Sequence, residues 1–383
     1  MGAILSGALA LFLCWGEPQD NRPSDAPWTH GPPTDPAFFP LAVWLQDVRN
    51  AAKYKEAGIN TYVALWRGPT QEQVDALNWV GMKLVCHQNE FGLKQKDDPT
   101  IIAWMHGDEP DNAQEKKGGG YGPPILPEKI ISDYKKIRAA DPSRPVLLNL
   151  GQGVAWDGYV GRGVRTNHPE DYSEYLKGSD IVSFDIYPVV HDHPDILGKL
   201  YKVAEGVDRL RKWGEGKKVV WNCIEASRIG NETAKPSAKQ VRSEVWMSLI
   251  HGSTGLIYFV HQFKPKFVEA SLLEDADLLA GVTALNQQIQ SLAPALNSPT
   301  ILNAATVRTS DSEAPVDLLV KRQGDSTWVF AAAMREKGTK ASFDVRGAKG
   351  SAEVLGENRT IALRDGKFDD EFRPYDVHLY RIK

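Results

Sequence analysis

The sequence predicts a (β/α)8 barrel followed by a small antiparallel β domain. Eight short apolar segments alternate with amphipathic stretches between residues 38 and 296. That part of the chain spans about 260 residues, the usual length of such a barrel. After Pro294 the pattern changes to period-two alternation broken by Gly, Asp and Asn, which is typical of antiparallel strands.

The eight apolar segments are predicted to be the barrel strands. Each is apolar on both faces in its middle, as a strand covered by helices must be. The segments are residues 39–47, 59–67, 82–90, 101–109, 145–153, 180–188, 218–226 and 254–262.

Helices are predicted between these segments. Glycines 58 and 81 end two of them as C-caps, and Pro127 stands in the first turn of a third. The connection after Glu90 is the weakest, with only a short turn. The alternative fold is a doubly wound open sheet, but no glycine-rich phosphate loop follows the first strand. The predicted helical stretches are residues 46–58, 70–81, 127–145, 195–214 and 274–296.

Three regions follow from this pattern: a leader and linker (1–35), a catalytic barrel (36–297) and a C-terminal β-sandwich domain (298–383). In the last region, "QGDS" and "RDGK" are typical of hairpin turns. We expect this domain to pack on the barrel, with sugar binding as the alternative role.

The N-terminus carries an apolar run from Ala3 to Trp15. The run is too short to span a bilayer and matches the apolar part of a signal peptide, although no Lys or Arg precedes it, as in a truncated signal. We therefore expect a secreted or periplasmic protein without a membrane span.

Composition narrows the classes of partner. The 383 residues carry a net charge of −4 with no Lys/Arg block, which argues against nucleic acid as a partner. The three cysteines are too few and odd in number for a disulfide framework. Nothing in the sequence indicates an oligomeric state.

Polar and aromatic side chains gather where the predicted strands end, which is where barrels of this kind build their active sites. Amides and acids hydrogen-bond hydroxyl groups, and tryptophan faces stack on pyranose rings, so the set suits a carbohydrate. Each member has packing as its alternative role, and we expect two of the four tryptophans to contact sugar. The candidate ligands are Trp44, Trp66, His87, Asp108, Asn149, Trp156, Asp185, Tyr187, Trp221 and Gln262.

Glu109 and Glu225 are the candidate catalytic pair. They end the predicted fourth and seventh strands, on opposite sides of the barrel mouth. Glycosidic cleavage needs one carboxyl group that donates a proton and one ionised carboxylate. The alternatives are structural: Glu109 as an acid at a helix N-terminus, and Glu225 as a buried ion-pair partner of Arg228.

Around these residues the chain resembles the clan A retaining glycoside hydrolases. The clan carries Asn-Glu, often followed by Pro, after strand four, and this sequence has Asp108-Glu109-Pro110. The resemblance implies Glu109 as acid/base, Glu225 as nucleophile, Tyr187 as a donor to that nucleophile, and no metal or cofactor. The expected reaction is hydrolysis of a glycosidic bond, expected to be β, in an oligo- or polysaccharide.

Asp108 departs from the clan pattern. An ionised Asp cannot donate to the sugar 2-hydroxyl as Asn does, so Asp108 is expected to accept from it or to raise the pKa of Glu109. The departure keeps a non-catalytic glycan-binding protein open as an alternative. A metal-dependent hydrolase using His87, His106, Asp108 and His261 is another, although the first strand lacks the His-x-His typical of that class.

Overall fold

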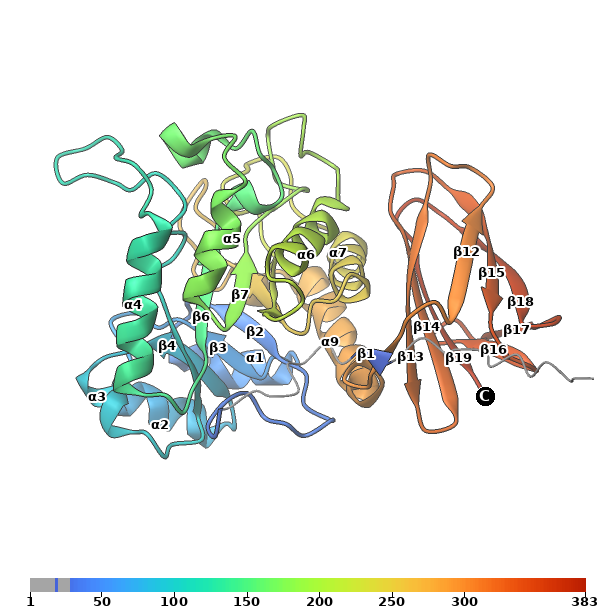
Figure 1. Ribbon diagram of the computed structural model, residues 1–383, viewed down its shortest axis with the longest axis horizontal. Helices are drawn as coiled ribbons and strands as arrows, with labels where there is room; N and C mark the ends of the chain where they lie inside the picture. Colours follow the sequence, from blue (N-terminus) through green and yellow to red (C-terminus); the bar gives the residue numbers. More distant parts are fainter. Residues whose placement is uncertain (1–17, 20–27) are drawn as a thin grey trace, which may run out of the picture.

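The computed structural model describes residues 18–19 and 28–383. The expected signal segment, residues 3–15, lies outside the described residues. In the described ranges, no helix is both long and apolar enough to cross a membrane. Figure 1 shows two units side by side, a barrel and, beyond helix α9 (Ala276–Leu296), a β-sandwich.

The predicted (β/α)8 barrel is confirmed. Its strands are parallel, and the seventh is interrupted at Trp221, so that its first part pairs with β7 and its second part with β10, which closes the sheet. All eight predicted strand segments contain a strand. The strands are β2 (Leu41–Trp44), β3 (Thr61–Val63), β4 (Lys83–His87), β5 (Ile101–Met105), β6 (Val146–Leu150), β7 (Ile181–Phe184), β8 (Val219–Val220), β9 (Asn222–Glu225) and β10 (Leu256–Phe259).

Helices cover the outside of the barrel, and local signals set their ends. Thr70 caps the second helix with a complete capping box, a feature that contributes about 1 kcal/mol. Gly58 and Gly81 have φ of 79° and 69°, which confirms both as C-caps. The other α-helices are α1 (Ala51–Glu56), α2 (Gln71–Trp79), α3 (Glu90–Lys94), α4 (Pro127–Ala140), α5 (Asp171–Tyr175), α6 (Lys202–Trp213), α7 (Ala238–Ile250) and α8 (Ser271–Glu274).

Helix α7 was missed by the sequence analysis. Its signal is a second capping box, in which the Ser237 hydroxyl accepts from the Gln240 amide while the Gln240 side chain accepts from the Ser237 amide. The helix is buried along most of its length between the barrel and the sandwich, so it lacks the polar stripe of an exposed helix.

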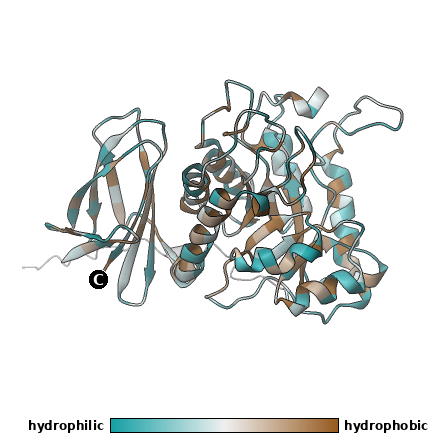
Figure 2. Ribbon diagram, turned by 180° about the vertical axis from the view of Figure 1, so that it is seen from behind, coloured by the Kyte–Doolittle hydropathy of each residue, from teal (hydrophilic) through white to brown (hydrophobic). Residues whose placement is uncertain are grey.

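Two apolar layers hold the barrel together. The inner layer fills the barrel with side chains such as Val63, Ala103 and Cys223, and the outer layer lies between strands and helices. Figure 2 shows the barrel strands largely hydrophobic and the loops above them largely hydrophilic. The interior is thus a packed core, and any site has to lie at its rim.

The C-terminal unit is a β-sandwich, as predicted. One sheet has the order β1-β11-β13-β14-β19-β16-β17 and the other β12-β15-β18. Both expected turns are present: Gly324 (φ 57°) follows β13, and Asp365 and Gly366 both have positive φ, as a type I′ turn requires. The strands are β1 (Pro18–Gln19), β11 (Thr300–Ile301), β12 (Ala305–Thr309), β13 (Val316–Gln323), β14 (Ser326–Ala333), β15 (Thr339–Val345), β16 (Ser351–Val354), β17 (Arg359–Ala362), β18 (Lys367–Phe372) and β19 (Val377–Ile382).

The sandwich packs on α7 and α9 through apolar and charged contacts. The rings of Trp246 and Phe330 lie 5.2 Å apart across this junction. At its edge, His251 contacts Asp208 of the barrel at 2.8 Å and Asp317 of β13 at 3.1 Å. Burial lowers the pKa of His251, but the two hydrogen-bonded carboxylates outweigh it and raise that pKa to about 9.

The His251 bridge predicts a pH-dependent contribution to stability. Its pKa is raised above the unfolded value of 6.5, so the bridge stabilises the fold fully below pH 6.5, and the contribution is lost as pH rises through about 9. We expect His251→Asn to cost about 1 kcal/mol at pH 6 and almost nothing at pH 10, measured by urea unfolding. His168→Asn, which removes an exposed His–Glu pair, is the control; an equal loss at both pH values for His251→Asn would contradict the bridge.

Candidate active site

Strained backbone marks the carboxyl ends of the barrel strands. Leu45, Ala64 and Glu109 follow β2, β3 and β5 with φ of 45°, 65° and 41°. Ile229, beyond β9, has φ of 52°, which is rare for a β-branched residue. Such strain persists where the surrounding structure imposes it, and it tends to gather at functional sites.

The side chain of Asn149, at the end of β6, joins two carboxylates. Its amide nitrogen donates to Asp108 at 2.9 Å and to Asp185 at 3.1 Å. Because both oxygens lie about 3 Å from one nitrogen, they are within about 6 Å of each other. Its amide oxygen accepts from Ser183 at 2.7 Å, which fixes the orientation of the group.

Asp185, just beyond β7, is buried and accepts a hydrogen bond from Asn149. Burial raises its pKa, and the hydrogen bond from Asn149 only partly offsets that rise. Burial and the charge of Asp185 together raise the pKa of Asp108 to about 7.

Glu109 belongs to the same cluster and is partly exposed at the rim. Burial, followed by the charges of Asp185 and Asp108, holds its pKa well above the usual range, which favours the protonated carboxyl. The nearby Glu109 charge also contributes, after burial, to a raised pKa of Tyr159. Tyr159 thus flanks the proton donor, although the sequence analysis did not select it.

Glu225 is not brought together with Glu109. It is fully buried, and its two carboxyl oxygens accept from the backbone amides of Val189 and Val190 at 2.6 and 3.0 Å. Burial raises its pKa to about 7. It faces Glu244 of helix α7, whose own pKa is held well above normal by burial and by Glu225. This enclosed position suits a structural role for Glu225, and its expected role as nucleophile stays a prediction.

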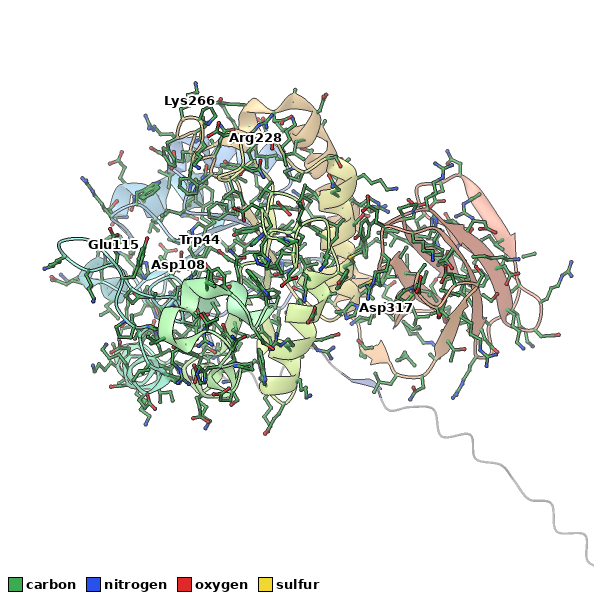
Figure 3. The ribbon with its side chains drawn as sticks, turned by 90° about the horizontal axis from the view of Figure 1, so that it is seen from above. Trp44, Asp108, Glu115, Arg228, Lys266 and Asp317 are labelled. Carbon is green, nitrogen blue, oxygen red and sulfur yellow. The ribbon has the colours of Figure 1, made fainter. Side chains whose placement is uncertain are left out.

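The four candidate tryptophans have different environments. Trp221 is 1% exposed in the inner layer of the barrel, so the expectation that it contacts sugar is wrong. Trp44 is also mainly buried, but Figure 3 places it beside Asp108 over the barrel. Trp66 is 46% exposed and donates from Nε1 to Glu269 at 2.5 Å. Trp156 is half-buried, its ring 4.5 Å from that of His193.

The remaining candidates divide between the rim and the loops. His87 is exposed at the end of β4, and Tyr187 lies beside Asp185. Gln262 is partly exposed and pairs through its backbone with Val268, within the loop after β10.

The histidines of the metal alternative are not gathered. His106 Nε2 contacts the Gly178 carbonyl at 2.8 Å, on the outside of the barrel, and His261 Nε2 contacts the Leu45 carbonyl at 2.9 Å. Within residues 28–383, no three His, Cys, Asp or Glu side chains are grouped as metal ligands would be.

A recess of about 490 Å³ opens beside Tyr187, a volume within the usual range for ligand sites. The loops after β6, β7, β9 and β10 form it. Its walls include Gln152, His191, Asn231 and Lys264. Tyr187 lines the recess and lies beside Asp185, so the recess adjoins the acid cluster.

No protein-family model and no curated protein matches the sequence. Solved structures do match. A cyclomaltodextrinase has a TM-score of 0.54 and 9% identity over 92% of this chain and 79% of its own. An Anoxybacillus alpha-amylase has a TM-score of 0.51 and 11% identity (88% and 89% covered), and alpha-galactosidase I from Mortierella vinacea 0.50 and 10% (91% and 98%). At these identities the similarity shows a shared barrel fold, the fold that the resemblance noted from the sequence implies.

The buried Glu225–Glu244 pair predicts that stability falls as pH rises. Glu225 has a folded pKa of about 7 against an ordinary 4.5, so the folded state binds more protons between these values and loses stability as pH rises through them. Glu244→Gln removes one acid and is expected to raise Tm at pH 8 by about 2–4 °C relative to wild type, with little change at pH 4.5. Glu72→Gln, on an exposed helix turn, is the control, and an equal gain at both pH values would contradict the pairing.

Proposed function

We propose that the chain is a retaining glycoside hydrolase with Glu109 as acid/base and Asp185 as nucleophile. The observation that carries the proposal is the acid cluster organised by Asn149 at the carboxyl end of the barrel. Asp108 is exposed and Glu109 partly exposed at the rim, whereas Asp185 lies buried beneath them and Glu225 is fully enclosed. The shared barrel fold of the matching hydrolases supports the reaction class by analogy.

The different pKa environments assign the two roles. A general acid has to be protonated at working pH, and burial together with two neighbouring acids keeps Glu109 in that state. A nucleophile has to be ionised; burial raises the pKa of Asp185, and the hydrogen bond from Asn149 opposes this by favouring the charged form. Asp185 attacks the anomeric carbon while Glu109 protonates the departing oxygen.

In the second step Glu109, now ionised, takes a proton from water, and the resulting hydroxide displaces Asp185 from the anomeric carbon. Retaining enzymes hold their carboxyl groups about 5–5.5 Å apart, whereas inverting pairs stand about 6.5–9.5 Å apart. The proposal therefore expects the carboxyl groups of Glu109 and Asp185 to stand about 5–5.5 Å apart.

Asp108 has an accessory role in this proposal. It is exposed to the cleft and keeps one oxygen on Asn149, which leaves the other to accept from a sugar hydroxyl. Its charge also contributes to the raised pKa of Glu109. The substrate is an oligo- or polysaccharide, and β configuration at the cleaved bond remains a prediction. Export of the protein, expected from the N-terminal run, is likewise proposed.

Substitution of the two proposed catalytic residues tests the assignment. Wild type and the variants Asp185→Asn, Glu109→Gln and Glu225→Gln are assayed on α- and β-aryl glycosides and on polysaccharides. We expect Asp185→Asn and Glu109→Gln each to lower kcat at least about a hundredfold. Glu225→Gln should keep most of its kcat, because an amide oxygen still accepts from one of the two loop amides.

The controls separate catalysis from folding. Circular dichroism and Tm of each variant show whether it is folded, and azide should restore turnover to Glu109→Ala on a glycoside with a good leaving group. NMR of the first-formed product reports retention or inversion. Loss of activity in a folded Glu225→Gln together with full activity in Asp185→Asn would overturn the assignment, and sugar binding without any hydrolysis would favour the non-catalytic alternative.

The pH profile of kcat/KM tests the role of Asp108. The Asp108 charge raises the pKa of Glu109, so Asp108→Asn should lower that pKa and move the basic limb of the profile to lower pH. The shift is measured with an aryl glycoside whose leaving group needs protonation. A basic limb that stays in place, in a variant that still turns over, would show that Asp108 does not tune the acid.

A further inference from the structure

Three exposed aromatic rings form a ledge beside the candidate site. Trp66, Phe263 and Phe267 are 46%, 49% and 54% exposed, and we call them the aromatic ledge. They surround the buried imidazole of His261, with ring centres 6.1, 6.1 and 5.8 Å from it. The rings come from the ends of strands two and eight, so the ledge occupies one sector of the barrel rim.

Cationic side chains accompany the ledge. Arg67 follows Trp66, while Lys264 and Lys266 lie between the two phenylalanines, and all three are exposed. None of them forms a salt bridge with any residue in the described ranges. Glu269 has a carboxyl oxygen that accepts from the Trp66 ring nitrogen and from the Asp47 amide, so it holds Trp66 in place.

The ledge adjoins the recess beside the acid cluster. Lys264 is also a wall of the recess that contains Tyr187. Figure 3 shows Lys266 and Arg228 on one side of the barrel mouth, with Trp44 and Asp108 further in. A chain running from the cluster toward this side would meet the recess first and the ledge next.

Charge distinguishes the recess from the aromatic ledge. The recess is also lined by Asp192 and Glu232, so its single lysine does not make it cationic. The ledge combines rings that can stack on sugars with three cations that have no salt-bridge partner among the residues the structure describes. A neutral sugar therefore suits the recess, whereas a group with a carboxylate or sulfate suits the ledge.

We propose that the aromatic ledge binds an anionic glycan, a chain bearing carboxylate or sulfate groups, and so selects acidic polysaccharides as substrates. The proposal rests on the proposed function for its catalytic consequence, but binding itself does not. Trp66, Phe263 and Phe267 stack on pyranose rings, while Arg67, Lys264 and Lys266 pair with the anionic substituents. Two other occupants of an exposed aromatic surface, a second copy of the chain and a lipid membrane, are outcomes of the test.

Binding is measured with the full chain carrying Asp185→Asn, so that no substrate is consumed. Affinity electrophoresis and calorimetry compare polygalacturonate, alginate and chondroitin sulfate with neutral galactan and xylan. We expect acidic chains to bind, and their binding to weaken as salt rises from 50 to 500 mM, because exposed charge pairs are screened.

Matched variants locate the site. Lys264→Gln with Lys266→Gln should weaken binding of an acidic chain about three- to tenfold at low salt. Phe267→Ala should weaken it about tenfold through lost stacking. The controls are Lys135→Gln with Lys349→Gln, two exposed lysines elsewhere, and Trp79→Ala, which is 91% exposed on α2.

The outcomes separate this inference from the proposed function. Equal binding of neutral and acidic chains, or equal losses in the controls, would overturn the ledge proposal. The proposal would also be overturned if no glycan binds and the chain instead forms a dimer, or binds anionic lipid vesicles, through a contact that Phe267→Ala abolishes. If wild type hydrolyses only neutral glycans, the proposed function stands and the ledge proposal fails. If wild type binds acidic chains in a salt-sensitive way but hydrolyses none, the ledge proposal stands and the proposed function fails.

Discussion

The two hydrogen bonds donated by the Asn149 amide organise the candidate site. Without them, Asp108 and Asp185 would be two acids facing one another at the end of a packed barrel. The amide supplies each with a donor, and Ser183 fixes the amide in turn, so the three strands that carry these groups are held in register at their ends. The elevated pKa of Glu109 then follows from its position beside these two acids.

The buried pair of Glu225 and Glu244 shows how hydrogen bonds to a buried carboxyl group also serve a structural purpose. Glu225 lies in an enclosed space, where an ionised carboxylate needs donors, and it receives two from the backbone of the loop after β7. That loop begins just beyond Asp185 and Tyr187. Glu225 thus fixes the loop that shapes one side of the site, and Glu244, held neutral, allows the pair to be buried.

The sequence predicted the barrel well because its signal is local and repeated. Apolar runs of strand length recur at regular spacing, and caps such as Thr70 or Gly58 depend on neighbouring residues only. Helix α7 was missed because it is buried by the second domain, which removes the polar stripe that marks an exposed helix. The ends of strands were also predictable as the place of the site, and Asp108, Glu109, Asn149 and Asp185 do meet there.

What the sequence could not supply was the direction of each side chain at the strand ends. Glu225 and Trp221 stand on a strand that is interrupted between β8 and β9, and periodicity says nothing of which neighbours they face after such a break. Phe263 and Phe267 were overlooked for a related reason, because a loop has no period from which exposure can be inferred. Both cases concern single side chains, whose partners come from elements distant in the chain.

A clan resemblance carries the position of a catalytic residue along a strand, but the surrounding hydrogen bonds decide whether a carboxylate at that position faces substrate. Here the donors at Glu225 come from backbone, which suits a structural clamp, while the donor at Asp185 is the Asn149 side chain at the carboxyl end of the barrel, which suits a reacting group.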